Sequence, residues 1–143
     1  TWSRVKYVFI VSVIMMAVIL LFARELDILL LGDDVAETLG ADTRRIKLLI
    51  ILASTVLTGV VVSVSGVIGF AGLVVPHVMR GFVGSGHKRL IPMSILGGGL
   101  FAMIADLISR IIIAPEELPI GVIAAFFGAP FFLYLIRKGS VGR

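Results

Sequence analysis

The sequence predicts an all-α fold, a polytopic transmembrane helical bundle with about five membrane helices, one of them short, and short helices on the cytoplasmic side. Its 143 residues are 59% hydrophobic and only 15% charged, whereas a soluble domain is about 45–50% apolar and about 25% charged. Charged residues are also absent from four long runs, at positions 7–23, 48–79, 90–105 and 118–136. Because a helix that crosses a bilayer needs about 20 mostly apolar residues, these runs predict membrane spans.

The direction of each span follows from the basic residues, since Lys and Arg accumulate in short cytoplasmic loops. Basic residues cluster at positions 24, 44–47, 80–89 and 137–143. With these clusters inside, the only outer basic residues are Arg4, Lys6 and Arg110. The run 7–23 then descends from outside to inside, 90–110 ascends and 118–136 descends. This topology places the N-terminus outside, and segment 24–45 and the C-terminus in the cytoplasm.

The run 48–79 has basic residues on both sides, so it must cross the membrane outward and return. We expect a full helix over about 46–64, a glycine-rich reversal over 65–72 and a shortened helix over about 73–82. Gly66, Gly69, Gly72 and Pro76 are the residues predicted for the helix break and the pathway, because broken or short helices commonly line transport paths. The alternative is that these glycines only allow close helix packing.

The cytoplasmic connection, residues 24–45, has structural signals of its own. Gly32 is expected to break the chain, and Asp33 or Asp34 to cap a short helix, with Glu37 completing a capping box. Gly40 suits the end of that helix. Val35 and Leu39, four residues apart, share one apolar face. That face could dock a partner protein, or it could lie on the lipid headgroups.

Asp106 and Arg110 lie four residues apart near the outer end of their predicted helix. They can form an intrahelical ion pair, or Arg110 can present its guanidinium to a carboxylate of a soluble partner. Residues 114–121, with two prolines around two acids, predict an external turn before the last helix. His77 and His87 have no partner ligands at metal-site spacing, so we expect them to pack or to lie at the cytoplasmic rim.

Several function classes are excluded by the residues. The chain has no cysteine, hence no disulfide or thiolate metal site, and it has no phosphate-binding loop motif. No nucleophile–base pair supports an enzyme, no cofactor is expected, and no basic stripe with aromatics indicates nucleic acid. The chain begins Thr-Trp-Ser, so we expect a single membrane domain, residues 1–143, that is a fragment of a longer protein lacking its earlier helices.

Six stretches of the sequence resemble the FecCD family of ABC-transporter permeases, which includes the membrane subunit of the vitamin B12 importer. They occur in family order and are residues 26–33 (LDILLLGD), 36–40 (AETLG), 69–77 (GFAGLVVPH), 105–110 (ADLISR), 117–122 (ELPIGV) and 128–132 (GAPFF). Val67, where many members have proline, and Gly86, where an acid often precedes the histidine, depart from the family pattern.

The resemblance implies a permease subunit of an importer for an iron-siderophore, haem or cobalamin-type ligand in the bacterial cytoplasmic membrane. This chain would be helices six to ten. A cytoplasmic ATP-binding subunit, an external substrate-binding protein and a second permease copy would be its partners, and ATP hydrolysis would reside in the separate subunit. Arg110 would face the binding protein. The ATPase-coupling residues would be Gly32, Asp33, Asp34, Val35, Ala36, Glu37, Leu39 and Gly40.

Two other function classes remain open from the residues alone. A fragment of an ion-driven secondary transporter or channel would need ionisable residues facing a midplane cavity, and only Asp106 comes near that requirement. A non-transporting membrane anchor is the second. Co-purification with a stoichiometric ATPase subunit distinguishes the importer from both.

Overall fold

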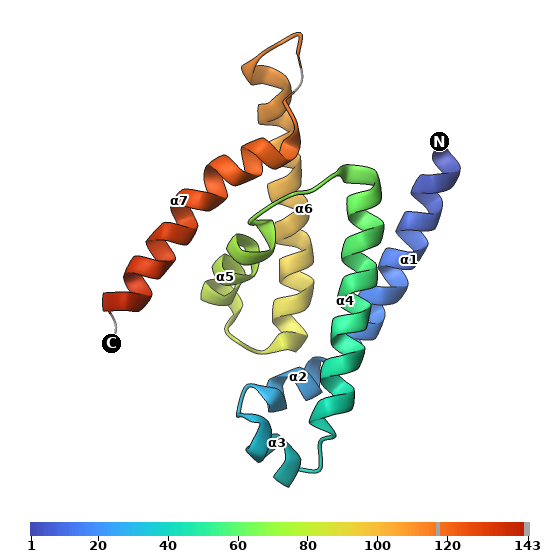
Figure 1. Cartoon of the computed structure of the whole chain (residues 1–143), viewed down its shortest axis with the longest axis vertical. Coiled ribbons are helices and arrows are strands. Elements are labelled where there is room, and N and C mark those ends of the chain that lie inside the picture. Colours follow the sequence, from blue (N-terminus) through green and yellow to red (C-terminus); the bar gives the residue numbers. More distant parts are fainter. Residues whose placement is uncertain (117, 142–143) are drawn as a thin grey trace. The chain divides into compact units, whose positions relative to one another are not determined.

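The computed structural model describes residues 1–116 and 118–141, and the regular secondary structure of this part is helical (Figure 1). The helices are α1 (Trp2–Leu21), α2 (Ala23–Leu29), α3 (Asp33–Thr38), α4 (Thr43–Ser65), α5 (Ala71–Val83), α6 (His87–Ile112) and α7 (Ile120–Val141). Helices α1, α4, α6 and α7 are long and apolar enough to cross a membrane, and α5 is a shorter apolar helix. The predicted all-α class and the order of long and short helices are therefore confirmed.

Most large apolar side chains are exposed on the surface of the described structure. The buried hydrophobic residues are few, and five of the nine are alanines; the set is Ala23, Ala36, Ile46, Ala53, Val75, Leu90, Ala105, Ile123 and Ala124. Small residues at helix contacts are typical of membrane proteins, because lipid tails are as apolar as the side chains and do not force large residues inward. This distribution fits lipid as the solvent of the long helices.

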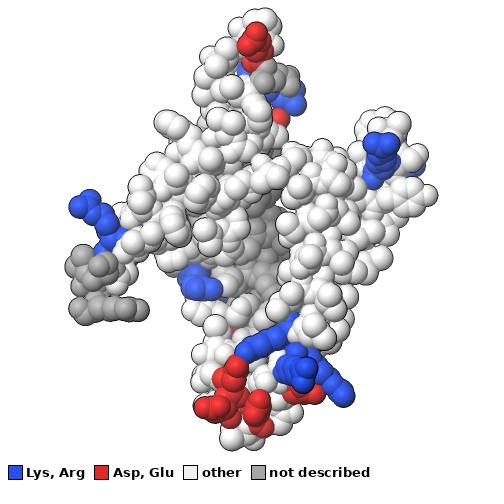
Figure 2. Space-filling model, in the orientation of Figure 1, with Lys and Arg blue, Asp and Glu red and all other residues white. Residues whose placement is uncertain are grey.

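The chain divides into two compact units. The first contains Thr1–Gly66 and Ser85–Ile91. In it, α1 packs along α4 with the opposite chain direction, and α2 and α3 pack against each other and against α4 (Figure 1). Charged side chains gather at the end that contains α3 and the start of α4 (Figure 2). The uncharged lengths of α1 and α4 lie between that end and the basic residues near the N-terminus.

The second unit contains Val67–Gly84 and the chain from Pro92 onward. Helix α5 packs against α7 and also approaches α6. A side chain at Gly97 of α6 would lie 3.1 Å from both Val75 Cγ1 and Met79 Cε of α5. Gly97 therefore permits the close approach of these two helices.

The predicted break between α4 and α5 is present, but it is shorter than expected. Helix α4 ends at Ser65, Gly66 follows with φ = 74°, and Phe70 has the left-handed φ = 64°. Gly66 and Gly69 lie in this break. Gly72 and Pro76 do not, because α5 already begins at Ala71. The predicted reversal over 65–72 therefore extended too far at Gly72. Pro76 lies inside α5, as the predicted helix over about 73–82 implied, and the helix continues through it although proline lacks a backbone N–H.

Candidate functional site

The polar connection between α1 and α4 contains α3, which coincides with the segment predicted to bind a partner. Gly32 precedes α3 with φ = 101°, a conformation that costs a side chain steric strain. After the last turn, the Gly40 N–H donates to the Glu37 carbonyl and the Ala41 N–H to the Ala36 carbonyl. This is the Schellman arrangement, and Gly40 has the positive φ, 86°, that it requires. Two glycines therefore set both ends of α3, as predicted.

The predicted capping of α3 by an aspartate is wrong. Gly32 is the N-cap residue, no side chain caps the helix, and Asp33 and Asp34 both lie in its first turn. Asp33 pairs instead with Lys47 Nζ at 2.5 Å, and Glu37 accepts a hydrogen bond from Thr43. A capping box assumes that the carboxylates find their donors within their own helix. Here the donors come from α4.

These same contacts attach α3 to the first turns of α4. Ala36 is fully buried, and Thr43 is only 7% exposed. The Thr43 hydroxyl donates to Glu37 Oε1 at 3.0 Å. Lys47, one helical turn after Thr43 on the same face of α4, forms the ion pair with Asp33, in which both side chains are about half exposed. One buried alanine and two polar contacts thus hold α3 against α4.

Two apolar side chains, one on α3 and one at its C-cap position, are exposed. Val35 is 44% exposed and Leu39 is 62% exposed. They are four residues apart, so they extend the same surface around the end of α3. These two exposed apolar side chains therefore lie on the segment that was predicted to bind a partner, at the charged end of the unit (Figure 2).

A second attachment, which no sequence pattern predicts, joins α2 to the start of α6. Asp27 Oδ1 accepts a hydrogen bond from the His87 backbone N–H at 2.8 Å and lies 2.6 Å from His87 Nδ1. The two residues are 60 positions apart, so no local pattern connects them. His87 is packed, which is one of the two positions expected for it, and its side chain is 17% exposed.

The environment of Asp27 shifts its pKa. Partial burial favours the neutral acid and would raise the pKa, but the two hydrogen bonds from His87 and the positive charge of its ring favour the carboxylate more. The net result is a pKa below the ordinary value of 3.8. Asp27 therefore stays ionised throughout the physiological range.

The break before α5 brings its residues onto α7. The Phe70 ring lies 6.2 Å from the Phe132 ring. A Cβ at Gly128 would collide with Phe70 Cβ, and a Cβ at Gly121 would collide with the Val67 carbonyl oxygen. Two glycines of α7 thus make room for the break, and neither was identified as a packing residue from the sequence.

The predicted Asp106–Arg110 pair is confirmed. Arg110 Nε donates to Asp106 Oδ2 at 3.0 Å, and the arginine side chain is 58% exposed in the last turn of α6. The proline-bracketed turn after α6 includes Glu117, which lies outside the described residues. His77 of α5 packs edge-on against Phe131, with the ring centroids 5.9 Å apart. Among the described residues, no group of three His, Asp or Glu side chains could hold a metal ion.

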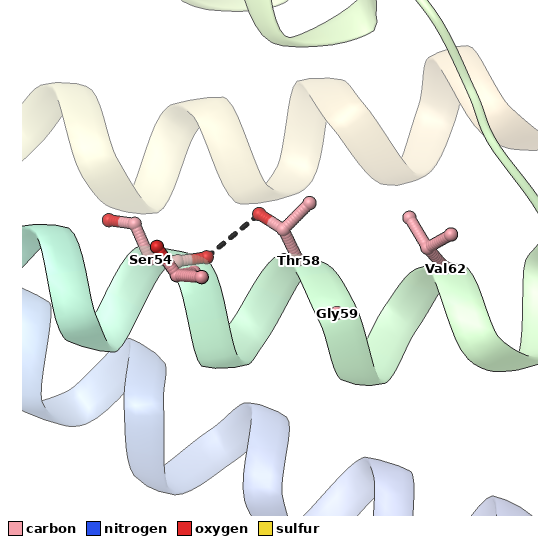
Figure 3. Close-up of a pocket in the computed structure, with 5 residues that line it drawn as sticks. Ser54, Thr58, Gly59 and Val62 are labelled. Carbon is pink, nitrogen blue, oxygen red and sulfur yellow. Dashed lines mark hydrogen bonds between the residues drawn. The ribbon is translucent and has the colours of Figure 1, made fainter.

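One face of α4 forms a shallow groove of about 480 Å³ that sequence reasoning missed (Figure 3). Its lining consists of Ser54, Thr55, Thr58, Gly59 and Val62. The Thr58 hydroxyl donates to the Ser54 carbonyl at 2.8 Å, and the Thr55 hydroxyl to the Ile51 carbonyl at 2.7 Å. The side chains that line the groove are small. The two threonine hydroxyls already donate within their own helix, so the groove is only weakly polar.

Comparisons with known proteins cover nearly the whole chain. A model of the FecCD transport family matches residues 1–138. The cobalamin import system permease protein BtuC of Halobacterium salinarum is 45% identical over 140 residues, which are 98% of this chain and 37% of that protein. The hemin transport system permease protein HmuU of Yersinia pestis is 47% identical over 119 residues, which are 83% of this chain and 36% of that protein.

A solved structure of a metal-chelate type ABC transporter in an inward-facing conformation is similar in fold. The TM-score is 0.88 at 30% sequence identity, and the match covers 96% of this chain and 44% of that one. The chain therefore spans less than half the length of these relatives.

Proposed function

The chain belongs to the FecCD transport family, and from this premise we propose that it is part of the permease subunit of an ATP-binding-cassette importer. The importer moves a bulky metal chelate, of the iron-siderophore, haem or cobalamin type, across the bacterial cytoplasmic (inner) membrane. Support for this ligand class comes from the names of the relatives, a cobalamin import permease, a hemin transport permease and a metal-chelate type ABC transporter. In this proposal ATP hydrolysis takes place in a separate partner subunit.

The proposed orientation puts segment 24–45 and the C-terminus in the cytoplasm and the last turn of α6 outside. It is supported by the excess of Lys and Arg at one end of the apolar runs. The long apolar helices lie in the bilayer, and their outward apolar side chains face lipid or the remaining helices of the transporter.

The observation that carries the proposal is the exposed apolar pair on α3. A cytoplasmic ATP-binding subunit docks on Val35 and Leu39, which are exposed while Ala36 on the same short helix is fully buried. ATP binding moves the partner and with it α3. Since Thr43 and Lys47 hold α3 against α4, the movement passes to a membrane helix and alternately opens the path inward and outward.

Further partners complete the assembly. An external substrate-binding protein docks near Arg110, whose exposed position in the last turn of α6 supports this role. A second copy of the permease forms the other half of the pathway. The break at Gly66 and Gly69, together with the short helix α5 that carries Gly72 and Pro76, lines part of it, because interrupted helices expose backbone groups that a pathway can use.

Among the residues that the structure describes, no contact favours the alternative of an ion-driven transporter. It needs an ionisable group facing a midplane cavity, and the one candidate, Asp106, is hydrogen-bonded to Arg110. Stoichiometric co-purification of an ATP-binding subunit with the full-length protein distinguishes the two functions.

The decisive experiment replaces Leu39 with aspartate in the full-length subunit. A carboxylate buried without a partner in the docking surface costs several kcal/mol, so we expect ATPase binding to weaken on the order of 100-fold and ligand uptake to stop. Leu39→Met, which keeps an apolar side chain of similar volume, is the matched control and should behave normally. Normal ATPase stimulation and uptake in Leu39→Asp, at equal membrane levels, would refute the docking role of α3.

A further inference from the structure

The Asp27–His87 contact joins two parts of the first compact unit that the chain separates by 60 residues. Helix α2, which carries Asp27, precedes α3 in the cytoplasmic connection. His87 is the first residue of α6. A single carboxylate oxygen lies within hydrogen-bond distance of both the backbone N–H and ring Nδ1 of His87, at 2.8 Å and 2.6 Å.

This geometry suits a cap supplied from another helix. The first N–H groups of a helix lack partners within it, and a carboxylate at that end is further favoured by the helix dipole. The His87 side chain is only 17% exposed and that of Asp27 is 40% exposed. Leu90, in the same first turn of α6, is 4% exposed, so the turn is also held by apolar packing.

We infer that Asp27 and His87 are positioning residues that transmit movement of the cytoplasmic connection to the first turn of α6. The inference rests on the proposed function, because it assumes that an ATP-binding subunit moves α3. It gives that movement a second route, separate from the attachment of α3 to α4 through Thr43 and Lys47.

The position of Pro92 supports a local role for the first turn of α6. The division between the two compact units falls between Ile91 and Pro92, so residues 85–91 belong to the same unit as α1 to α4. Pro92 lies inside α6 and has no N–H to donate to the Lys88 carbonyl, which loosens the helix at that point. The same helix carries Arg110 in its last turn, so α6 contains both a residue tied to the connection and the residue proposed to meet the binding protein.

The test uses the complete transporter in proteoliposomes, with full-length permease, ATP-binding subunit and binding protein loaded with cyanocobalamin or hemin. The measured quantity is ligand imported per ATP hydrolysed, for Asp27→Ala, His87→Ala and the double variant. Lys88→Ala, a neighbouring exposed residue, is the matched control. His87→Asn is the conservative variant, because its amide nitrogen lies close to the position of His Nδ1 and also donates.

We expect each single alanine variant to import about fivefold less ligand per ATP, at the low end of couplings between distant sites. The double variant should import no less ligand per ATP than the more impaired single variant, because both changes remove the same contact. His87→Asn should recover most of the ratio, and Lys88→Ala should match the unaltered protein. Hydrogen exchange of residues 87–91 should accelerate in Asp27→Ala, since the cap is lost.

An unchanged ratio in both alanine variants, or losses that multiply in the double variant, would overturn the inference. If Asp27→Ala does not assemble, the same cycle with Asp27→Asn and His87→Phe decides it by the same criterion. The proposed function has its own readout: an unaltered transporter without ATPase stimulation or uptake refutes that function, whereas normal unaltered activity with unaffected variants refutes only the role of Asp27 and His87.

Discussion

Replacing Thr43 with valine tests whether α3 is held on α4 by the contacts described above. The two side chains have nearly the same shape, so the substitution removes the hydroxyl and little else. The Thr43 hydroxyl donates to Glu37 Oε1 at 3.0 Å, and Thr43 is 7% exposed. In the variant, Glu37 loses its donor from α4.

The expected cost follows from the exposure of the two partners. A hydrogen bond to a charged group contributes about 1.5–3 kcal/mol, but Glu37 is exposed and water can replace the lost donor. We therefore expect about 1 kcal/mol, which corresponds to roughly a fivefold larger population of detached α3. Lys47→Met should cost less, about 0.2–1 kcal/mol, because the ion pair with Asp33 is half exposed.

Amide hydrogen exchange of residues 33–41 in the assembled full-length protein measures this population directly. Thr38→Val is the matched control. It makes the same chemical change on α3 itself, but the Thr38 hydroxyl donates to the Val35 carbonyl within the helix at 2.7 Å. Exchange should therefore rise about fivefold in Thr43→Val and little in Thr38→Val.

Equal exchange in Thr43→Val and the unaltered protein would show that the buried Ala36 alone holds α3. The Lys47→Met effect should shrink as salt rises from about 0.1 M to 1 M, because exposed ion pairs are screened. An effect of Lys47→Met larger than that of Thr43→Val would contradict the assignment of the main attachment to the buried hydroxyl.

Three further substitutions test other parts of the molecule. Arg110→Glu should weaken docking of the external binding protein about tenfold or more, measured by titration calorimetry, and an acid-to-base change on that protein should restore it; no rescue would argue against a charge contact. Gly128→Ala should lower the free energy of unfolding by about 1–3 kcal/mol, because the added Cβ meets Phe70. Gly139→Ala, which has open space around it, should leave that free energy unchanged, and equal melting temperatures for the two variants would contradict this prediction. Because the pKa of Asp27 is lowered, the stabilisation by its carboxylate is complete above pH 3.8 and is lost as the pH falls through the pKa of the folded state. Asp27→Asn should therefore reduce the fall of the melting temperature at acidic pH. An unchanged pH dependence of the melting temperature would count against the His87 contact.

Helix positions in this chain could be predicted well because lipid leaves few alternatives. Backbone N–H and C=O groups in a bilayer must be satisfied within the segment, so a long apolar run is almost obliged to be a helix. The charge-free run 7–23 corresponds to α1, and the run 118–136 to α7. The short helix after the break, predicted over 73–82, is α5, and only the exact extent of the break was missed.

The contacts of the polar segment 24–45 were much harder to predict. The aspartates at 33 and 34 matched a capping pattern, but the choice between a cap and an ion pair depends on whether Lys47 reaches Asp33, which is a property of the tertiary fold. Asp27 and His87 carry no pattern at all across 60 residues. The sequence supplied the donor and acceptor types, and only the packing of α2, α3 and α6 assigned them to each other.

The two kinds of contact imply different sensitivities within one chain. In the apolar helices, close approach depends on the absence of side-chain atoms, as at Gly97 and Gly128, so adding a methyl group is the damaging change. Around α3, only Ala36 supplies a fully buried apolar contact, and the remaining attachments are polar. Removing a hydroxyl without changing shape is therefore damaging there. If the cytoplasmic connection transmits the movement of an ATP-binding subunit, isosteric polar-to-apolar changes should uncouple hydrolysis from transport at that end, whereas glycine-to-alanine changes in α7 should lower stability first.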